Sequence, residues 1–283
     1  MNWSRFKFYC NEVRRLLARG EDVIPAFESA KSSVLSKEFG PEINPQEIQA
    51  SILTDLKNEN YTNEEVKKAL EIYDGIDVSE LVHKPARIRR VGIYIGYLTF
   101  MYFVLSSIYF VYVIPQTVSM FETMKITAPE SFIWFVNNWA TILVIVMAFL
   151  VGAFLVSRVV KEIFEYKKGV EKSIIYRFIL PKRIKSRFER IVSLIQLPLH
   201  IAKNKNDGIN DHIIEYYQAE KYSSKEISDS LSILINENIS HLILHSEAYM
   251  RRIYVVISIL VILSIYEFVS SAYAPLFVMG GVL

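Results

Sequence analysis

Three long apolar stretches divide a chain that is otherwise rich in polar side chains. They cover residues 91–114, 131–157 and 253–283 and carry one charged side chain, Glu267. A helix of about 20 apolar residues crosses the hydrocarbon core of a bilayer. Because a backbone in lipid must satisfy its own hydrogen bonds, each stretch is predicted to be a membrane-spanning helix.

The boundaries follow from the flanking charges and prolines. The predicted order is a helical domain at 1–90, a span at 91–114, a short loop at 115–132, a span at 133–157, a second helical domain at 158–252, a span at 253–275 and a tail at 276–283. The predicted fold class is an all-α polytopic membrane protein with two helical-bundle cytoplasmic domains and three transmembrane helices.

Lysine and arginine flank the spans on one side. Arg89 and Arg90 precede the first span, eleven basic residues follow the second within 158–190, and Arg251 and Arg252 precede the third. The loop before the second span holds only Lys125. The positive-inside rule therefore predicts a cytoplasmic N-terminus and a C-terminus on the opposite side.

Both polar blocks show helical spacing. In the first, Phe6, Cys10, Val13, Leu16 and Leu17 share one helical face, which predicts a buried stripe with Cys10 in the core. Gly20 is predicted to end this helix. The run from Asn44 to Glu47 resembles a helix cap with proline at the first helical position.

The two blocks also resemble each other. Tyr61–Leu70 aligns with Tyr222–Leu231, and each segment has a capping box, with Glu65 and Glu226 at the equivalent acidic position. Nearly the same offset relates Arg89-Arg90 to Arg251-Arg252 and Pro115 to Pro275. This order and spacing predict a duplicated unit of helical domain plus span.

Catalytic signatures are missing from the sequence. There is no Gly-x-x-x-x-Gly-Lys loop for phosphate and no Gly-x-Ser-x-Gly elbow. We therefore expect a protein that is not an enzyme and has no cofactor. His241 and His245 are spaced i, i+4, which fits either a zinc pair or a solvated helix face.

Glu267 lies about 21 Å into the third span at the helical rise of about 1.5 Å per residue. Intramembrane carboxylates are costly and are functional candidates by default. One interpretation is a contact with another protomer or with a partner's spanning helix. The other is a protonated or snorkelling side chain bonded within its own helix, to Ser264, Ser270, Ser271 or Tyr273.

Charge separates the blocks as well. Residues 38–80 carry eleven acidic and three basic side chains, and residues 158–190 carry eleven basic and four acidic ones. The basic segment fits anionic lipid or an acidic partner. The acidic segment fits a solvated surface or a docking face for a basic cytoplasmic motor.

Several short motifs carry a resemblance to one family. Leu16-Leu17-Ala18-Arg19-Gly20 resembles its Leu-Leu-x-x-Gly signature, Val113-Ile114-Pro115 with Phe121 resembles the end of its first span, and Pro275-Leu276-Phe277 the end of its last. The chain thus resembles the type II secretion F and type IV pilus inner-membrane platform proteins. It lacks their usual N-terminal extension and their Gly-Glu-x-x-Gly element. In these departures the chain resembles a divergent branch of the family, such as one that serves a type IVb or conjugative pilus.

The resemblance implies a bacterial inner-membrane platform with a periplasmic C-terminus. Its implied partners are a cytoplasmic assembly ATPase, pilins, other inner-membrane proteins of the machine, lipids and further copies of the chain, and it implies no nucleic acid. The candidate partner or coupling residues are Gly20, Glu65, Arg89, Arg90, Pro115, Phe121, Glu226, Arg251, Arg252, Glu267, Pro275 and Phe277. Rival interpretations are a small transporter or channel and a membrane-anchored sensor.

Overall fold

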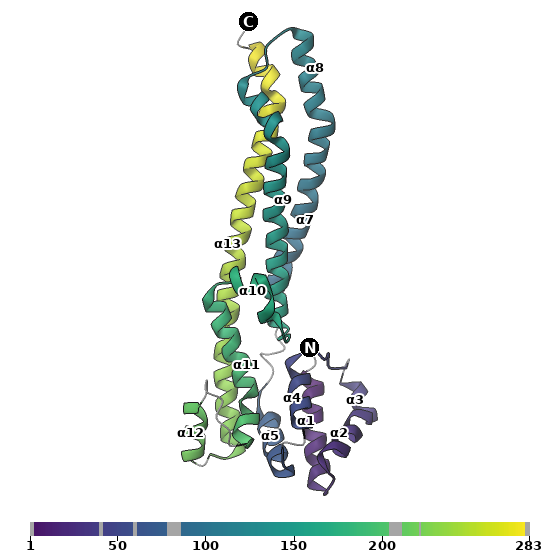
Figure 1. Ribbon diagram of the computed structural model, residues 1–283, viewed down its shortest axis with the longest axis vertical. Coiled ribbons are helices and arrows are strands. Elements are labelled where there is room, and N and C mark those ends of the chain that lie inside the picture. The colour runs from purple at the N-terminus through teal and green to yellow at the C-terminus, as the bar shows by residue number, and fades with distance from the viewer. Residues whose placement is uncertain are drawn as a thin grey trace. The chain divides into compact units, whose positions relative to one another are not determined.

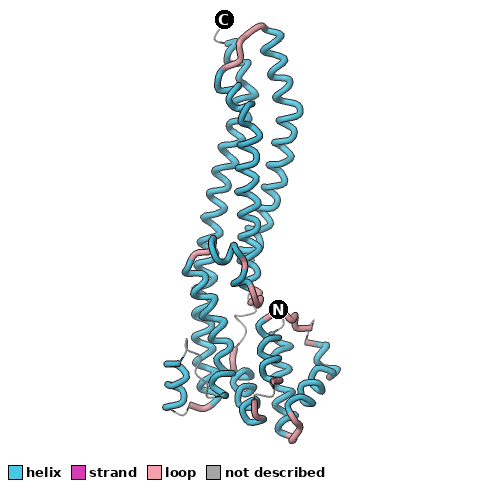
Figure 2. Tube along the Cα trace, in the orientation of Figure 1, coloured by secondary structure: helices cyan, strands magenta, loops and turns pink. Residues whose placement is uncertain are grey.

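Helices make up the regular structure of the described residues. The computed structural model describes residues 3–39, 42–58, 61–77, 86–203, 211–220 and 222–280. Within these ranges every regular element is a helix, and extended pairing is limited to one bridge between Glu47 and Lys167 (Figures 1 and 2). The all-α prediction is confirmed for this part of the chain.

The chain divides into two compact units. Unit 1 comprises residues 1–85 and 159–246, and unit 2 comprises residues 86–158 and 247–283. Unit 1 therefore combines residues of both predicted helical blocks. The separation of these blocks into two bundles is not confirmed.

Unit 1 is built from short helices and one long one. They are α1 (Trp3–Ala18), α2 (Val23–Ser32), α3 (Val34–Glu38), α4 (Ile48–Leu56), α5 (Asn63–Gly75), η2 (Val170–Lys172), α10 (Ile174–Phe178), α11 (Lys182–Lys203), α12 (Asp211–Ala219) and the first part of α13 (Ser224–Gly280). The end of α9 (Glu130–Phe164) also belongs to this unit.

The predicted buried stripe of α1 is confirmed except at Leu17, which is only half-buried. Phe6, Cys10 and Val13 are at most 1% exposed. The helix ends as expected at Gly20, whose φ of 88° lies in the left-handed region that glycine adopts readily. The Glu21 amide donates to the Leu16 carbonyl and the Gly20 amide to the Leu17 carbonyl, which is the Schellman pattern.

The start of α4 differs from the sequence prediction. Asn44 does not cap a helix; its side chain accepts a hydrogen bond from the Gln46 amide in a turn, and α4 begins at Ile48. The delay has a tertiary cause, because the Ile48 amide donates to the Tyr166 carbonyl and the Gln46 carbonyl accepts from Lys168. These bonds hold the preceding backbone extended.

Both predicted capping boxes are present. Glu65 accepts from the Thr62 amide at 2.8 Å and its own amide donates to the Thr62 hydroxyl. Glu226 accepts from the Ser223 amide at 2.8 Å and its amide donates to the Ser223 hydroxyl. The aligned segments thus begin helices α5 and α13 by the same chemistry.

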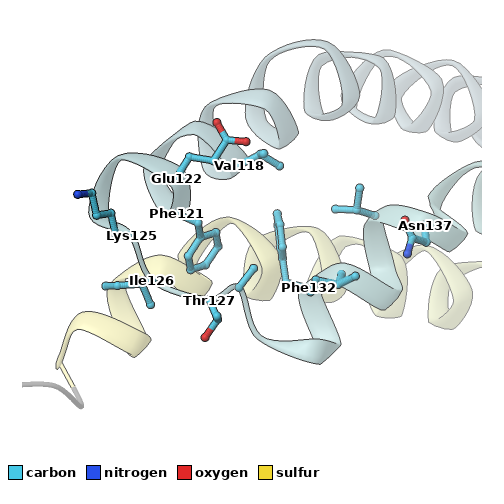
Figure 3. Close-up of a pocket in the computed structure, with 11 residues that line it drawn as sticks. Val118, Phe121, Glu122, Lys125, Ile126, Thr127, Phe132 and Asn137 are labelled. Carbon is cyan, nitrogen blue, oxygen red and sulfur yellow. The ribbon is translucent and has the colours of Figure 1, made fainter.

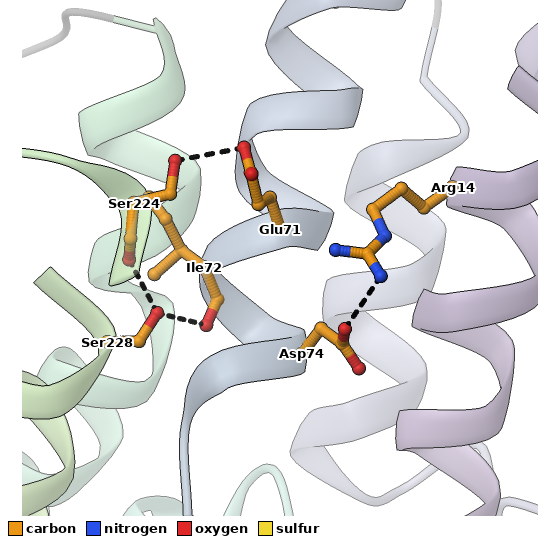
Figure 4. Close-up of polar contacts among 6 residues, drawn as sticks. All are labelled: Arg14, Glu71, Ile72, Asp74, Ser224 and Ser228. Atoms are coloured by element: carbon orange, nitrogen blue, oxygen red, sulfur yellow. Dashed lines mark hydrogen bonds and ion pairs between the residues drawn. The ribbon is translucent and has the colours of Figure 1, made fainter. Parts of the chain in front are cut away.

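The two aligned helices contact each other inside unit 1 (Figure 4). Ser228 donates to the Ile72 carbonyl at 2.9 Å, and Ser224 donates to the Glu71 carboxylate at 3.0 Å. On the other side of α5, Arg14 of α1 pairs with Asp74 at 2.9 Å. Residues from both blocks therefore bond directly to α5.

A third helix completes this junction. The Tyr73 hydroxyl of α5 donates to the Ile195 carbonyl of α11 at 2.9 Å, and both side chains are buried. Burial raises the pKa of Tyr73 well above its usual range, so the phenol remains a hydrogen-bond donor. The helix α5 thereby joins α1 to α11 and α13.

Unit 2 holds the apolar helices. They are α7 (Ala86–Ile108), the π-helical turn η1 (Tyr109–Val113), α8 (Ile114–Met124), most of α9 and the second part of α13. Three stretches are long and apolar enough to cross a membrane: Arg90–Met124, Phe132–Phe164 and one within Ser224–Ser271. The prediction of three such helices is confirmed.

The helices extend beyond the predicted boundaries. The first does not end before Pro115, because η1 and α8 carry it on to Met124, so the expected loop at 115–132 is largely helical. Proline lacks an amide hydrogen, and the wider π-helical turn before it accommodates that loss. At the other end, α13 runs five residues past position 275, to Gly280.

Candidate functional site

An aromatic cluster fills the interior of unit 2. Tyr109 of η1 stacks on Phe268 of α13 at 4.8 Å and meets Phe135 of α9 edge-on at 5.9 Å. Tyr102 of α7 also stacks on Phe268, at 6.1 Å. All four rings are at most 7% exposed. The cluster ties the three apolar helices together.

Polar groups lie beside these rings. The Tyr102 and Ser264 hydroxyls are hydrogen bonded at 2.7 Å between α7 and α13. The Ser106 hydroxyl and the Trp139 ring N–H are buried and have no hydrogen-bond partner in the described part of the chain. Asn138 donates to the Trp134 carbonyl of its own helix at 2.8 Å.

Glu267 points away from this interior. Its side chain is exposed, whereas Phe268 beside it and Ser264 and Ser271 nearby are buried. Ser271 donates to the Glu267 backbone carbonyl at 2.7 Å, not to the carboxylate. Within the described residues the carboxylate has no hydrogen-bond or ion-pair partner, so the expected bond to a neighbouring serine or tyrosine is not observed.

A pocket of about 460 Å³ lies between α8 and α9 (Figure 3). Its wall is mostly apolar, and Phe121 and Phe132 pack against each other there at 5.5 Å. Glu122 and Lys125 lie on the α8 side of the pocket, and Asn137 lies further along α9. Phe121, singled out in the sequence, is thus a buried wall residue of this pocket.

Lys125 ends α8 in a strained backbone conformation. Its φ of 52° lies in the left-handed region, and it ends α8 where a glycine is more usual. The Ile126 amide donates to the Phe121 carbonyl and the Lys125 amide to that of Glu122. This turn sets the charged side chains of the pocket beside its apolar wall.

The other predicted site residues are scattered. Arg90, Arg251 and Arg252 are exposed. Arg89, Pro275 and Phe277 lie within helices, but their side chains fall outside the described part of the structure. Gly20, Glu65 and Glu226 have local roles in ending or beginning helices of unit 1. They do not converge on one site.

His241 and His245 stack at 6.3 Å on α13. Glu237 is 3.9 Å from His241, and the side chains of both are well exposed. No group of three His, Cys, Asp or Glu side chains suited to a metal occurs among the described residues. The pair therefore has the geometry of a solvated helix face.

Sequence reasoning did not find the aromatic cluster or the pocket. The dense Tyr and Phe content of residues 97–112 was the available signal, but the lipid and the interior both accept aromatic rings.

Comparisons with protein families, with curated proteins and with solved structures find no match for the chain.

Proposed function

We propose that this chain is an inner-membrane platform protein of a type IV pilus or type II secretion-like machine. In this role a cytoplasmic assembly ATPase acts on the polar helices, and pilins meet the apolar helices within the membrane. The chain transmits the motion of the motor to pilin subunits entering the fibre. It does no chemistry on a substrate.

The observation that carries the proposal is the exposed Glu267 carboxylate. A carboxyl group at this depth is costly unless another group bonds to it. The described residues of the chain offer none, so we infer that a spanning helix of another chain supplies a basic or hydrogen-bonding group. A pilin, held in the membrane by one apolar helix, is the partner that the motif resemblance implies.

Helix α13 supports a coupling role. Its 57 residues run without interruption from the capping box of unit 1 to the apolar region, a length of about 85 Å at the usual rise. The helix carries Ser224 and Ser228, bonded to α5, at one end and Glu267 near the other.

The acidic surface proposed for motor docking is smaller than the sequence count implies. Glu71 and Asp74 are engaged within unit 1, and Glu65 caps α5. Glu38, Glu42 and Glu64 remain exposed. We assign the docking face to these three side chains, where charge reversal leaves the observed internal contacts intact.

Photocrosslinking in fibre-forming cells tests the proposal. The crosslinking residue p-benzoylphenylalanine replaces Leu263, which is 56% exposed and lies one turn before Glu267 on the same face. Its matched control replaces Val269, which is 49% exposed and lies about 160° from Glu267 around the helix. We expect an adduct with a small single-span protein of pilin size from position 263 and far less from position 269.

The functional arm uses Glu267→Ala and Glu267→Gln, scored by fibres per cell. If the partner group is cationic, both variants are expected to reduce the number of fibres per cell. If the partner group only forms a hydrogen bond, Glu267→Ala reduces that number and Glu267→Gln does not. Fibres that persist after deletion of the whole chain would refute the platform function. Adducts formed equally at both positions would instead refute the role of the Glu267 face.

A further inference from the structure

A short basic and apolar segment follows the second span candidate. Residues 167–185 contain seven lysines and arginines and one glutamate. We call these residues the α10 segment, after the helix at its centre, Ile174–Phe178. The whole segment belongs to unit 1, the unit that contains the polar helices.

Large apolar side chains of the α10 segment are unusually exposed. Ile174 is 75% exposed, Phe178 76% and Ile179 49%. Ile174 and Phe178 are spaced i, i+4 and therefore share one helical face. Clustered apolar exposure of this kind on a polar unit marks an interaction surface.

The rest of the segment is anchored, which fixes this face. Tyr176 is 4% exposed, lies edge-on to Phe188 at 6.1 Å and donates to the Glu189 carboxylate at 3.1 Å. Lys185 donates to the Arg177 carbonyl at 2.6 Å. The apolar face is thus held by contacts with α11, so its exposure is not a frayed end.

Cations surround the apolar face. Lys167 pairs with Glu165 at 3.0 Å, and Lys168 donates to Ser51. Four more cations are exposed and make no ion pair within the described residues: Lys172, Arg177, Lys182 and Arg183.

Chain connectivity limits how far the segment can lie from the second apolar helix. The apolar run of that helix ends at Ser157, and α9 continues through charged residues to Phe164, ten residues before Ile174. Ten residues reach at most about 36 Å even when fully extended. The chain between them turns at Tyr166 and Gly169, both with positive φ, so the actual reach is shorter.

We propose that the α10 segment lies in the headgroup region of an anionic membrane leaflet, with Ile174 and Phe178 inserted and the four exposed cations on lipid headgroups. An apolar face bordered by lysine and arginine is what interfacial helices present to anionic lipid. An acidic protein surface complements the cations but offers no reason for two large apolar side chains. The proposal does not depend on the pilus function.

The test uses the full chain in lipid nanodiscs with Cys10→Ala as background. Phe178→Cys carries an environment-sensitive fluorophore, and Ile233→Cys is the matched control, because Ile233 is 69% exposed in the same unit on α13. Discs contain phosphatidylcholine alone or with phosphatidylglycerol, and nitroxide lipids act as quenchers. We expect a blue-shifted, strongly quenched label at 178 in anionic discs and a water-like, unquenched label at 233.

A second variant separates charge from apolar insertion. Replacing Lys172, Arg177, Lys182 and Arg183 with glutamine should lower quenching at 178 in anionic discs to the level seen in neutral discs. Equal quenching at 178 and 233 would overturn the proposal. So would a label at 178 that is shielded in native membranes but water-like in anionic discs, since a protein partner then covers the face.

Discussion

At the scale of single residues, three helices end on the same left-handed turn. Gly20 closes α1, Lys125 closes α8 and Tyr166 closes α9, with φ of 88°, 52° and 46°. A side chain in this conformation costs roughly 1–2 kcal/mol. Tyr166 offsets the cost by burial, since it is 2% exposed and stacks on Phe188. Lys125 has no such packing, and its strained turn holds it beside the pocket.

Cys10 should be chemically inert in the folded protein. It is fully buried, and burial, with a smaller contribution from Asp74, raises the pKa of its thiol far above the usual range. Because the thiolate is the reactive form, we expect no maleimide labelling of the native chain and full labelling after unfolding, measured by mass. An exposed Ser32→Cys control should label at once. Rapid native labelling of Cys10 would contradict the packing of α1.

Glu226 should make stability depend on acid pH. Hydrogen bonds from the backbone and hydroxyl of Ser223 hold the pKa of Glu226 below its usual range. A lowered folded pKa gives stability that is present above the unfolded value of about 4.3 and is lost as pH falls through the folded pKa. Thermal unfolding should therefore rank wild type above Glu226→Gln at neutral pH.

The difference in unfolding temperature between wild type and Glu226→Gln should shrink at about pH 3, where the Glu226 carboxyl of the unfolded chain is protonated. Glu220→Gln, an exposed carboxylate in the same region, is the matched control and should melt like wild type at both pH values. A constant gap between Glu226→Gln and wild type across this pH range would show that the effect does not come from ionisation.

At the scale of elements, α5 and α13 begin alike and then differ. The helix α5 ends at Gly75, whereas α13 continues through the aligned Asn236 toward the membrane region. Glycine is a poor helix former, but here it also allows close packing. A Cβ at position 75 would lie 2.5 Å from the Ser228 hydroxyl oxygen and 2.6 Å from its Cβ.

Gly75→Ala should therefore destabilise unit 1. Overpacking of this kind costs about 1–3 kcal/mol, seen as a lower unfolding temperature of the full chain in detergent. Ser228→Gly in the same chain should restore part of the loss by removing the clashing atoms. Lys67→Ala, at an exposed position of α5, is the control. An unchanged melting temperature for Gly75→Ala would mean that the α5–α13 contact is looser than described.

The sequence predicts the features that local chemistry controls. The capping boxes of Thr62 and Ser223, the end of α1 at Gly20 and the apolar helices were all predicted correctly. The helix ends at Lys125 and Tyr166 were not, because neither position has a glycine to mark it. The late start of α4 depends on contacts distant in sequence, and the exposed face of α10 depends on contacts with α11; periodicity reports neither.

At the scale of the molecule, unit 1 is made from two distant segments. Contacts of α5 with α11 and α13 join residues before the first apolar helix to residues after the second. The halves should therefore depend on each other. Residues 1–85 and 86–283, co-expressed as separate chains, are expected to co-purify from detergent.

Ile72→Arg is the variant that should separate the two co-expressed chains, because Ile72 is fully buried in α5. Lys68→Ala, exposed on the same helix, is the control and should leave co-purification intact. Wild-type fragments that fold but do not associate would favour the two independent bundles predicted from the sequence.

The junction between α5 and α13 also fixes an order of biogenesis. Ile72 and Ser228, hydrogen bonded in the finished protein, are 156 residues apart in the chain. At usual synthesis rates the second residue leaves the ribosome about 8 to 30 s after the first. During that interval the two intervening apolar helices enter the bilayer, and the face of α5 that later packs against α13 stays uncovered. Helix α13 is the last to be translated, and it completes unit 1. A ribosome that stalls early in α13 therefore leaves a chain whose first two apolar helices are in the membrane but whose unit 1 is incomplete.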